Sequence, residues 1–340
     1  MKRFLVAAAV LVIAGVTQAV PAMAAQQQKP PPVHTVTVGS NPIDVVISQR
    51  QSKAYVANDG SVSVLSLVTH REVAQVGTGF HDQTAIGLVR CDSEAYIGTF
   101  NLKDLKVLNT STLKLSGTID VGFGATDIVA ARTPSGEYAY VTLLTSNAVA
   151  VVRTSDNKLV KTIRLPAGPQ TAQTTPDGKD VWVGSSYSGH IWVVSTATQR
   201  VVRDIPVPDS GPVSSIAFAP GGKRAWVYGL AGVSVIDVTT GDLLAFLPIT
   251  YLYPHSPAPN AGPIALTAGG AYALVVNSTF PDDPMRGTVA VVDTRTLHVL
   301  DRVTVGTEPT GLAIDYDRQT AYVTNFQDDT VSYFKTPCDH

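Results

Sequence analysis

Four residues that precede strand-like segments have side chains suited to a binding or catalytic site. Asp44 and Asp127 each begin a segment of small and β-branched residues, and His81-Asp82 precedes another. Grouped carboxylates suit a cation or the amine and hydroxyl groups of a ligand. An imidazole oriented by a carboxylate can act as a general base. Turn capping by the aspartates and an ordinary surface role for the histidine are the alternatives.

A second group of candidate ligand-binding residues lies in two insertions of the chain, at residues 249–257 and 277–287. The insertions carry Tyr251, Tyr253, His255 and Arg286, with Asp282 and Asp283 beside the arginine. Such side chains join an apolar body or stem to a polar tip, and variable loops on a rigid scaffold commonly carry binding residues. We expect both insertions to lie outside the packed core. The alternative is a surface insertion without function, which costs little stability.

The sequence contains no metal-binding motif and no phosphate-binding loop. We therefore expect no cofactor, and a divalent metal only if the protein is an enzyme. Cys91 and Cys338 are the only cysteines and lie far apart in the sequence. A disulfide between them is open to an exported protein, and two isolated thiols, or one thiol paired outside the chain, are the alternative.

A strand that recurs seven times must position these candidates. It reads Ala-Tyr-Val-Thr-Asn at residues 321–325. Its central residues are Tyr55, Tyr96, Tyr140, Trp182, Trp226, Leu274 and Tyr322. A spacing of 41 to 48 residues and a strand-like composition are typical of a β-propeller with one four-stranded blade per repeat. We predict an all-β, seven-bladed β-propeller over residues 33–336, in which the aromatic residues pack between blades.

The two ends of the repeat region predict how the ring closes. The last repeat stops after its third strand, at residues 331–334, whereas a spare strand at 34–38 precedes the first repeat. We expect the spare strand to complete the last blade, because closure removes an open interface. In this architecture the loops that enter the inner strands and those that join the second and third strands share one face. Asp44, Asp82, Asp127 and both insertions belong to this top face.

Three segments of the last two repeats resemble a known family. They are Ala-Tyr-Val-Thr-Asn at 321–325, Gly-Thr-Glu-Pro at 306–309 and Val-Ala-Val-Val-Asp-Thr at 289–294. They resemble the repeat of the YVTN-type seven-bladed β-propellers, and the resemblance covers about residues 33–336. Similar proteins include periplasmic or surface binding propellers, lactonases, a streptogramin-type lyase and the haem-binding domain of a nitrite reductase. This chain lacks the Cys-x-x-Cys-His motif of that haem domain, and the repeat describes a scaffold with no fixed activity.

The first 24 residues have the pattern of a cleaved secretory signal. Lys2 and Arg3 precede an apolar run at 4–16, and Ala-Met-Ala stands at 22–24. We expect a secreted or periplasmic protein that begins near Ala25. A Gln/Pro-rich tether would then occupy residues 25–32, and a short tail would occupy 337–340.

Charge argues against two classes of partner. Loss of Lys2 and Arg3 with the signal would change the formal net charge from −2 to −4, and no basic run remains. This gives no bulk electrostatic reason to bind nucleic acid or an anionic membrane. We expect no membrane span after signal cleavage, and a monomer.

The sequence thus predicts an exported propeller that acts as a binding or interaction module through its top face. The partner would be a small molecule, a polysaccharide or a protein. One alternative is a secreted lyase or lactonase-type enzyme that uses His and acidic residues of the top face. Another is a structural or adhesive surface module.

Overall fold

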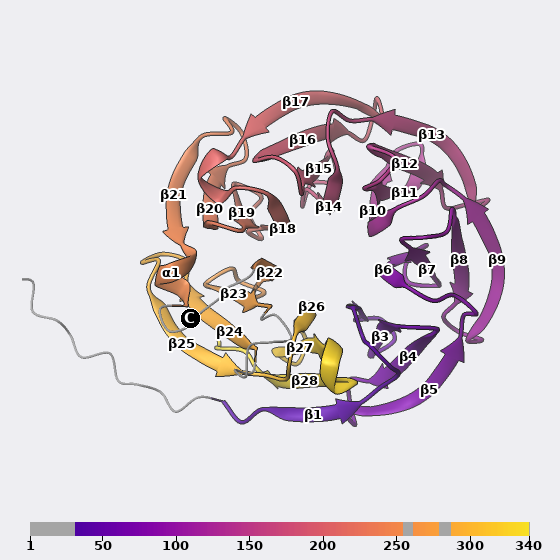
Figure 1. Ribbon diagram of the computed structural model, residues 1–340, viewed down its shortest axis with the longest axis horizontal. Helices are drawn as coiled ribbons and strands as arrows, with labels where there is room; N and C mark the ends of the chain where they lie inside the picture. Colours follow the sequence, from indigo (N-terminus) through magenta and orange to yellow (C-terminus); the bar gives the residue numbers. More distant parts are fainter. Residues whose placement is uncertain (1–30, 254–260, 279–286, 340) are drawn as a thin grey trace, which may run out of the picture.

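Short strands separated by Gly, Pro and Asp turns form seven four-stranded antiparallel sheets arranged as a ring (Figure 1). The computed structural model describes residues 31–253, 261–278 and 287–339. The predicted signal segment, His255, Asp282, Asp283 and Arg286 lie outside the described residues. Each sheet is one propeller blade, so the prediction of an all-β, seven-bladed β-propeller is confirmed.

The blades follow the chain, with the inner strand of each blade first. Blade 1 contains β2 (Asp44–Ser48), β3 (Lys53–Asn58), β4 (Ser61–Ser66) and β5 (Arg71–Gly77). Blade 2 contains β6 (Gln83–Val89), β7 (Glu94–Thr99), β8 (Asp104–Asn109) and β9 (Lys114–Asp120). Blade 3 contains β10 (Ala125–Thr133), β11 (Gly136–Leu143), β12 (Ala148–Arg153) and β13 (Lys158–Arg164). Blade 4 contains β14 (Pro169–Thr174), β15 (Asp180–Ser185), β16 (His190–Ser195) and β17 (Arg200–Pro206).

The remaining blades repeat this order. Blade 5 contains β18 (Val213–Phe218), β19 (Arg224–Gly229), β20 (Gly232–Asp237) and β21 (Leu243–Pro248). Blade 6 contains β22 (Ala261–Leu266), β23 (Tyr272–Asn277), β24 (Thr288–Asp293) and β25 (Val299–Thr304). Blade 7 contains β26 (Pro309–Asp315), β27 (Thr320–Asn325), β28 (Thr330–Lys335) and β1 (His34–Thr37). The short helices are η1 (Pro208–Ser210), α1 (Ile249–Leu252) and η2 (Phe326–Asp328).

Strand β1 closes the ring as the spare strand predicts. It pairs antiparallel with β28, with Val36 opposite Val331 and Thr37 opposite Thr330. In Figure 1, β1 runs along the outside of blade 7 and leads to blade 1. The first strand of the chain therefore holds the last blade in place.

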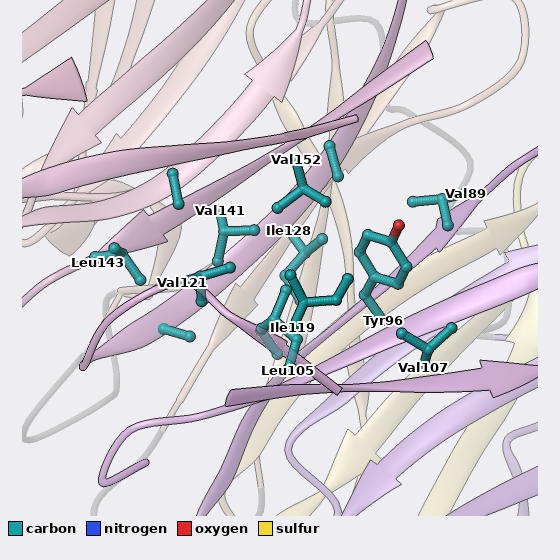
Figure 2. Packing of buried hydrophobic residues seen from close by; sticks show 14 of the residues in the cluster. Val89, Tyr96, Leu105, Val107, Ile119, Val121, Ile128, Val141, Leu143 and Val152 are labelled. Atoms are coloured by element: carbon teal, nitrogen blue, oxygen red, sulfur yellow. The ribbon is translucent and has the colours of Figure 1, made fainter. Parts of the chain in front are cut away.

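The core consists of apolar clusters between neighbouring blades, and Figure 2 shows the cluster between blades 2 and 3. The central residues of the recurring strand are at most 1% exposed in every blade, so their predicted packing role is confirmed. The hydroxyl groups of Tyr96 and Tyr322 also join blades. Tyr96 donates a hydrogen bond of 2.5 Å to Asn157 Oδ1 in blade 3, and Tyr322 lies 2.8 Å from His70 Nδ1 in blade 1. Rigid aromatic rings fill the wedge between sheets at low cost in side-chain entropy.

The outer strands carry the exposed and charged residues. In β5 only two positions are partly covered, and Arg71 and Glu72 at its start are exposed. Charged side chains at a sheet edge hinder pairing with other chains. No helix among the described residues is long and apolar enough to span a bilayer.

Candidate functional site

The seven inner strands enclose a central channel with a volume of about 810 Å³. Residues from β2, β6, β10, β14, β18, β22 and β26 line it. Its carboxyl groups are those of Asp44, Asp92, Asp127 and Glu308, and no Lys, Arg or His of the described chain lines it. The channel is therefore acidic. It runs from the face on which the inner strands begin, which is the top face, to the bottom turns that carry Asp92 and Tyr316.

The carboxylate of Asp44 joins blade 1 to blade 2. Its Oδ2 accepts a hydrogen bond of 3.2 Å from the backbone N of Ile86, and its Oδ1 accepts one of 2.8 Å from Val45 N. Burial raises the pKa of Asp44 despite these two bonds. The side chain thus lines the channel and also serves as a link between two blades.

Asp127 makes the equivalent link from blade 3 to blade 4. Its Oδ2 accepts hydrogen bonds from Ala172 N at 2.8 Å and Thr171 Oγ1 at 3.1 Å, and its Oδ1 accepts one from Ile128 N. Burial, together with the nearby charge of Asp44, raises the pKa of Asp127 to about 7. This carboxyl therefore changes charge near neutral pH.

The same position of the inner strand has this linking role in a third blade. Ser215 Oγ accepts a hydrogen bond of 3.2 Å from Ile264 N, so blade 5 is joined to blade 6 as blade 1 is joined to blade 2. One residue earlier in the strand, hydroxyl groups make a complementary link. Thr126 donates to Pro169 O at 3.3 Å, and Thr310 donates to Pro42 O at 3.1 Å. These hydroxyl links cannot be recognised in the sequence, because their signal is only a polar residue near the start of an inner strand.

The titration of Asp127 gives a testable pH dependence. Its folded pKa of about 7 lies above the unfolded value of 3.8, so its contribution favours folding at low pH and is lost as the pH rises from about 4 to about 7. A tenfold difference in proton affinity corresponds to about 1.4 kcal/mol. We expect Asp127→Asn to remove this dependence, while loss of one acceptor destabilises the variant at every pH by about 1 kcal/mol.

Urea unfolding at pH 4, 5.5, 7 and 8.5 measures both effects. The wild type should be more stable than Asp127→Asn by about 1 kcal/mol at pH 4 and less stable than it at pH 8.5, because the rise in the pKa of Asp127 from 3.8 to about 7 corresponds to a loss of several kcal/mol in the wild type. Ser215→Ala removes an equivalent link without a titrating group and is the control. A difference in stability that does not change with pH would show that Asp127 stays ionised in the folded protein.

His81 and Asp82 lie on exposed loop surface and are not among the residues that line the channel. His81 Nδ1 is 3.2 Å from Asp59 Oδ1, which also accepts a hydrogen bond from Asp82 N. Asp82 Oδ2 accepts a hydrogen bond of 2.8 Å from Asn101 Nδ2. The structure thus pairs His81 with Asp59 at the junction of blades 1 and 2, and it does not bring Asp82 to Asp44 and Asp127.

The first insertion of blade 6 is partly built into the core, which corrects the expectation that it lies outside. Tyr253 is only 4% exposed, and its hydroxyl donates to Val275 O and accepts from Ala290 N at 3.4 Å. Leu252 is also fully buried. The physical reason is that helix α1 turns this segment inward over the gap beside blade 5, where apolar surface remains to be covered.

Tyr251 is the insertion residue that the structure leaves at the surface, with 43% of its area exposed. Its carbonyl accepts a hydrogen bond of 3.0 Å from Arg302 Nη2, and the Leu252 carbonyl accepts one of 2.6 Å from Arg302 Nε. The backbone that carries the tyrosine is thereby fixed to β25. His255 and Arg286, the other two candidates of the insertions, lie outside the described residues.

The top loops expose more large apolar side chains than the bottom loops. In the described chain, the exposed members of the top loops are Leu102, Phe123, Tyr187, Leu230 and Tyr251. They come from five consecutive blades, 2 to 6, and we call them the apolar arc. The loops of the opposite, bottom face expose Val68 and Tyr316. Of the arc, only Tyr251 is among the residues predicted from the sequence, because a single apolar residue in a loop does not reveal its neighbours.

The top and bottom loops also differ in their charged residues. The acidic residues of the described top loops are Asp59, Asp82, Asp209, Glu308, Asp328 and Asp329. Lys103 is the one Lys or Arg in those described loops, and it pairs with Asp120 at 2.5 Å. The described bottom turns and tail hold Asp92, Asp156, Asp177, Asp242, Asp317 and Asp339. They also hold Arg50, Arg90, Lys179, Lys223, Arg295 and Arg318. Among the described loops, acidic excess is therefore a property of the top face.

No three His, Cys, Asp or Glu side chains of residues 31–253, 261–278 and 287–339 are grouped to hold a metal ion. Cys91 and Cys338 are both exposed and unpaired with each other. Cys91 Sγ accepts a hydrogen bond of 2.8 Å from Arg132, and Cys338 lies in the tail beside Gln319.

Comparisons with known proteins identify the architecture. No protein-family model and no curated protein sequence matches the chain. Among solved structures, hydrazine synthase of Kuenenia stuttgartiensis is similar, with a TM-score of 0.75 and 19% identity over 88% of this chain and 96% of that chain. The β-propeller domain of Cps50 (Swd1) from Myceliophteria thermophila has a TM-score of 0.72 and 11% identity, over 90% of this chain and all of that one. At such identities the likeness shows the fold alone, and the chain is a seven-bladed β-propeller.

Proposed function

We propose that this protein is an exported propeller that binds its partner through the top face. The observation that carries the proposal is the apolar arc, in which each of five consecutive blades exposes one large apolar side chain on the same face. Exposed apolar patches rimmed by polar groups are typical of interaction sites. Aromatic residues on loops held by a rigid scaffold contribute much of the affinity at such sites. The pattern of the first 24 residues supports export.

The scaffold supports the ring of Tyr187 from below. The ring packs against Gly168, in the loop that enters blade 4, where an added Cβ would meet the ring at 2.6 Å. Leu144 of blade 3 contacts the same glycine. Although 66% of Tyr187 is exposed, its underside is supported, so the side chain loses little freedom on binding.

A substitution set tests the proposal. We expect the triple variant Phe123→Ser, Tyr187→Ser and Leu230→Ser to melt within a few degrees of the wild type, since these side chains are 52%, 66% and 50% exposed. Thermal shift with a panel of amines, oligosaccharides and short peptides should find a ligand that stabilises the wild type. Affinity for that ligand should fall at least tenfold in the variant, because important contacts contribute roughly 1–2 kcal/mol each.

The matched control carries Val73→Ser, Val202→Ser and Leu300→Ser on the outer strands, where exposure is 54%, 58% and 49%. Its affinity should equal that of the wild type. A ligand bound equally by both triple variants would place the binding surface elsewhere. A panel without any ligand of the top face would reject the proposal.

A further inference from the structure

The top face is divided into an apolar and an acidic part. The apolar arc covers blades 2 to 6, with Phe123, Tyr187 and Leu230 as its three most exposed members. Five of the six top-loop carboxylates lie instead at blades 7, 1 and 2, and we call them the acidic sector. The sector comprises Glu308, Asp328, Asp329, Asp59 and Asp82. A partner that covers both parts must be amphipathic.

The carboxylates of the acidic sector have only weak charge compensation. Asp329 accepts from Asn41 N at 2.8 Å, Asp328 from Thr307 N at 2.9 Å and Glu308 from Gln327 Nε2 at 2.9 Å. These donors are neutral and fix the carboxylates without cancelling their charge. No Lys or Arg of the described chain lies within 4.0 Å of a sector carboxylate, and His81 is the one ion-pairing partner found there, at Asp59. A preoriented, uncompensated set of carboxylates favours a cationic partner.

We propose that the top face binds a basic amphipathic polypeptide segment of another protein. Its apolar residues would cover Phe123, Tyr187 and Leu230, and its Lys or Arg side chains would reach the acidic sector. This inference rests on the proposed top-face binding and specifies its ligand class. Burial of the arc supplies affinity, whereas the charges speed association and select for sign. The described bottom turns and tail expose only Val68 and Tyr316 as large apolar residues and hold as many basic as acidic residues, so they give no comparable selection.

Defined peptides test the ligand class. The probe is a fluorescent 14-residue amphipathic peptide of Leu and Lys, about 21 Å long as a helix. Two matched peptides carry Glu in place of Lys, or Ser in place of Leu. Fluorescence anisotropy at 50 and 200 mM NaCl should show binding of the Leu/Lys peptide, at least tenfold weaker binding of both controls, and weaker binding at the higher salt concentration.

Protein variants locate the binding surface. Neutralisation by Asp59→Asn, Asp82→Asn and Glu308→Gln should weaken binding of the Leu/Lys peptide at least tenfold and reduce its salt dependence. Phe123→Ser, Tyr187→Ser and Leu230→Ser should weaken it as much but leave the salt dependence. The control Glu72→Gln, Asp242→Asn and Asp317→Asn removes the same charge from exposed positions at the bottom end of the blades, and should change affinity less than twofold.

The outcomes separate this inference from the proposed function. If the Glu peptide or a neutral compound binds and loses affinity in the arc variant, the top face is the binding surface and the basic class is wrong. If no probe distinguishes the top variants from their controls, both proposals fail. Sedimentation velocity tests whether a second copy of this chain covers the top face. A dimer that dissociates in the arc variant would assign the surface to a second copy of this chain and overturn the inference.

Discussion

Removal of strand β1 is expected to lower the free energy of unfolding of the whole ring by several kcal/mol. Four residue pairs join β1 to β28, and each net hydrogen bond contributes about 1 kcal/mol. The deletion also uncovers Val331 and the ring of Tyr333, on which His34 stacks at 5.4 Å. Loss of this burial adds to the effect. We expect the melting temperature to fall by roughly 5–10 °C.

The comparison uses a chain that begins at residue 31 and one that begins at Gly39. A single cooperative transition at lower temperature in the shorter chain would show that β1 stabilises the ring and not only its own edge. Val36→Asp keeps the length of the chain and places a carboxylate among the apolar residues between blades 7 and 1, so it should also lower the melting temperature of the ring. Equal melting of the two chains would contradict the closure role.

A peptide added in trans provides a stricter test. If β1 acts by pairing with β28, a synthetic peptide of residues 31–40 should restore the melting temperature of the shorter chain in a saturable manner. The same peptide with Val36→Asp is the control and should not restore it. Rescue by both peptides would point to a nonspecific effect.

The second large effect is expected at the C-terminal tail, where Asp339 is predicted to stabilise blade 6 by about 2 kcal/mol. Its Oδ1 accepts hydrogen bonds from Thr267 Oγ1 at 2.5 Å and Ala271 N at 3.1 Å, and its Oδ2 accepts one from Gly269 N at 2.7 Å. In Asp339→Ala these three donors of the turn between β22 and β23 lose their acceptor. The three hydrogen bonds place the tail residue Asp339 at blade 6, although β28, which precedes the tail, belongs to blade 7.

The equivalent turn of blade 4 supplies its own carboxylate and needs none from the tail. There, Asp177 of the turn itself accepts from Thr175 Oγ1 at 2.8 Å and from Lys179 N at 3.1 Å. Gly269 stands where Asp177 would be in blade 6, and a Cβ on Gly269 would lie 2.9 Å from the Asp339 Cγ. The tail therefore delivers the carboxylate that the turn of blade 6 lacks.

A double-mutant cycle tests whether an aspartate at position 269 can replace Asp339. Asp339→Ala should destabilise, and Gly269→Asp should restore most of the loss in the Asp339→Ala background, because it gives the turn its own carboxylate. The following Gly270 has a φ of 73°, close to the 71° of Gly178 in blade 4, so the backbone suits this change. Urea unfolding of the four proteins gives the coupling energy. If the two substitutions change the free energy of unfolding additively, an aspartate at position 269 does not replace Asp339.

The sequence determined the architecture because the pattern of a propeller blade is local. Side chains of a strand alternate between two faces, so the strands, turns and aromatic packing residues of each blade can be predicted from the sequence of its own repeat. Seven such repeats and one spare strand at the N-terminal end were sufficient to predict the ring and its closure, and the structure confirms both. The same reasoning placed Asp44 and Asp127 at the tops of inner strands, where the structure has them.

Tertiary structure alone decided what the candidate residues contact. Tyr253 turns into the core, Asp44 and Asp127 accept bonds from the next blade, and Asp339 fills the place of a side chain that Gly269 lacks. The apolar arc likewise emerges only when loops of five blades meet on one face. These contacts join residues distant in the sequence, and a loop residue has no periodic pattern that records its neighbours. The repeat therefore specifies the scaffold, whereas the surface that meets a partner is set by how the blades bring their loops together.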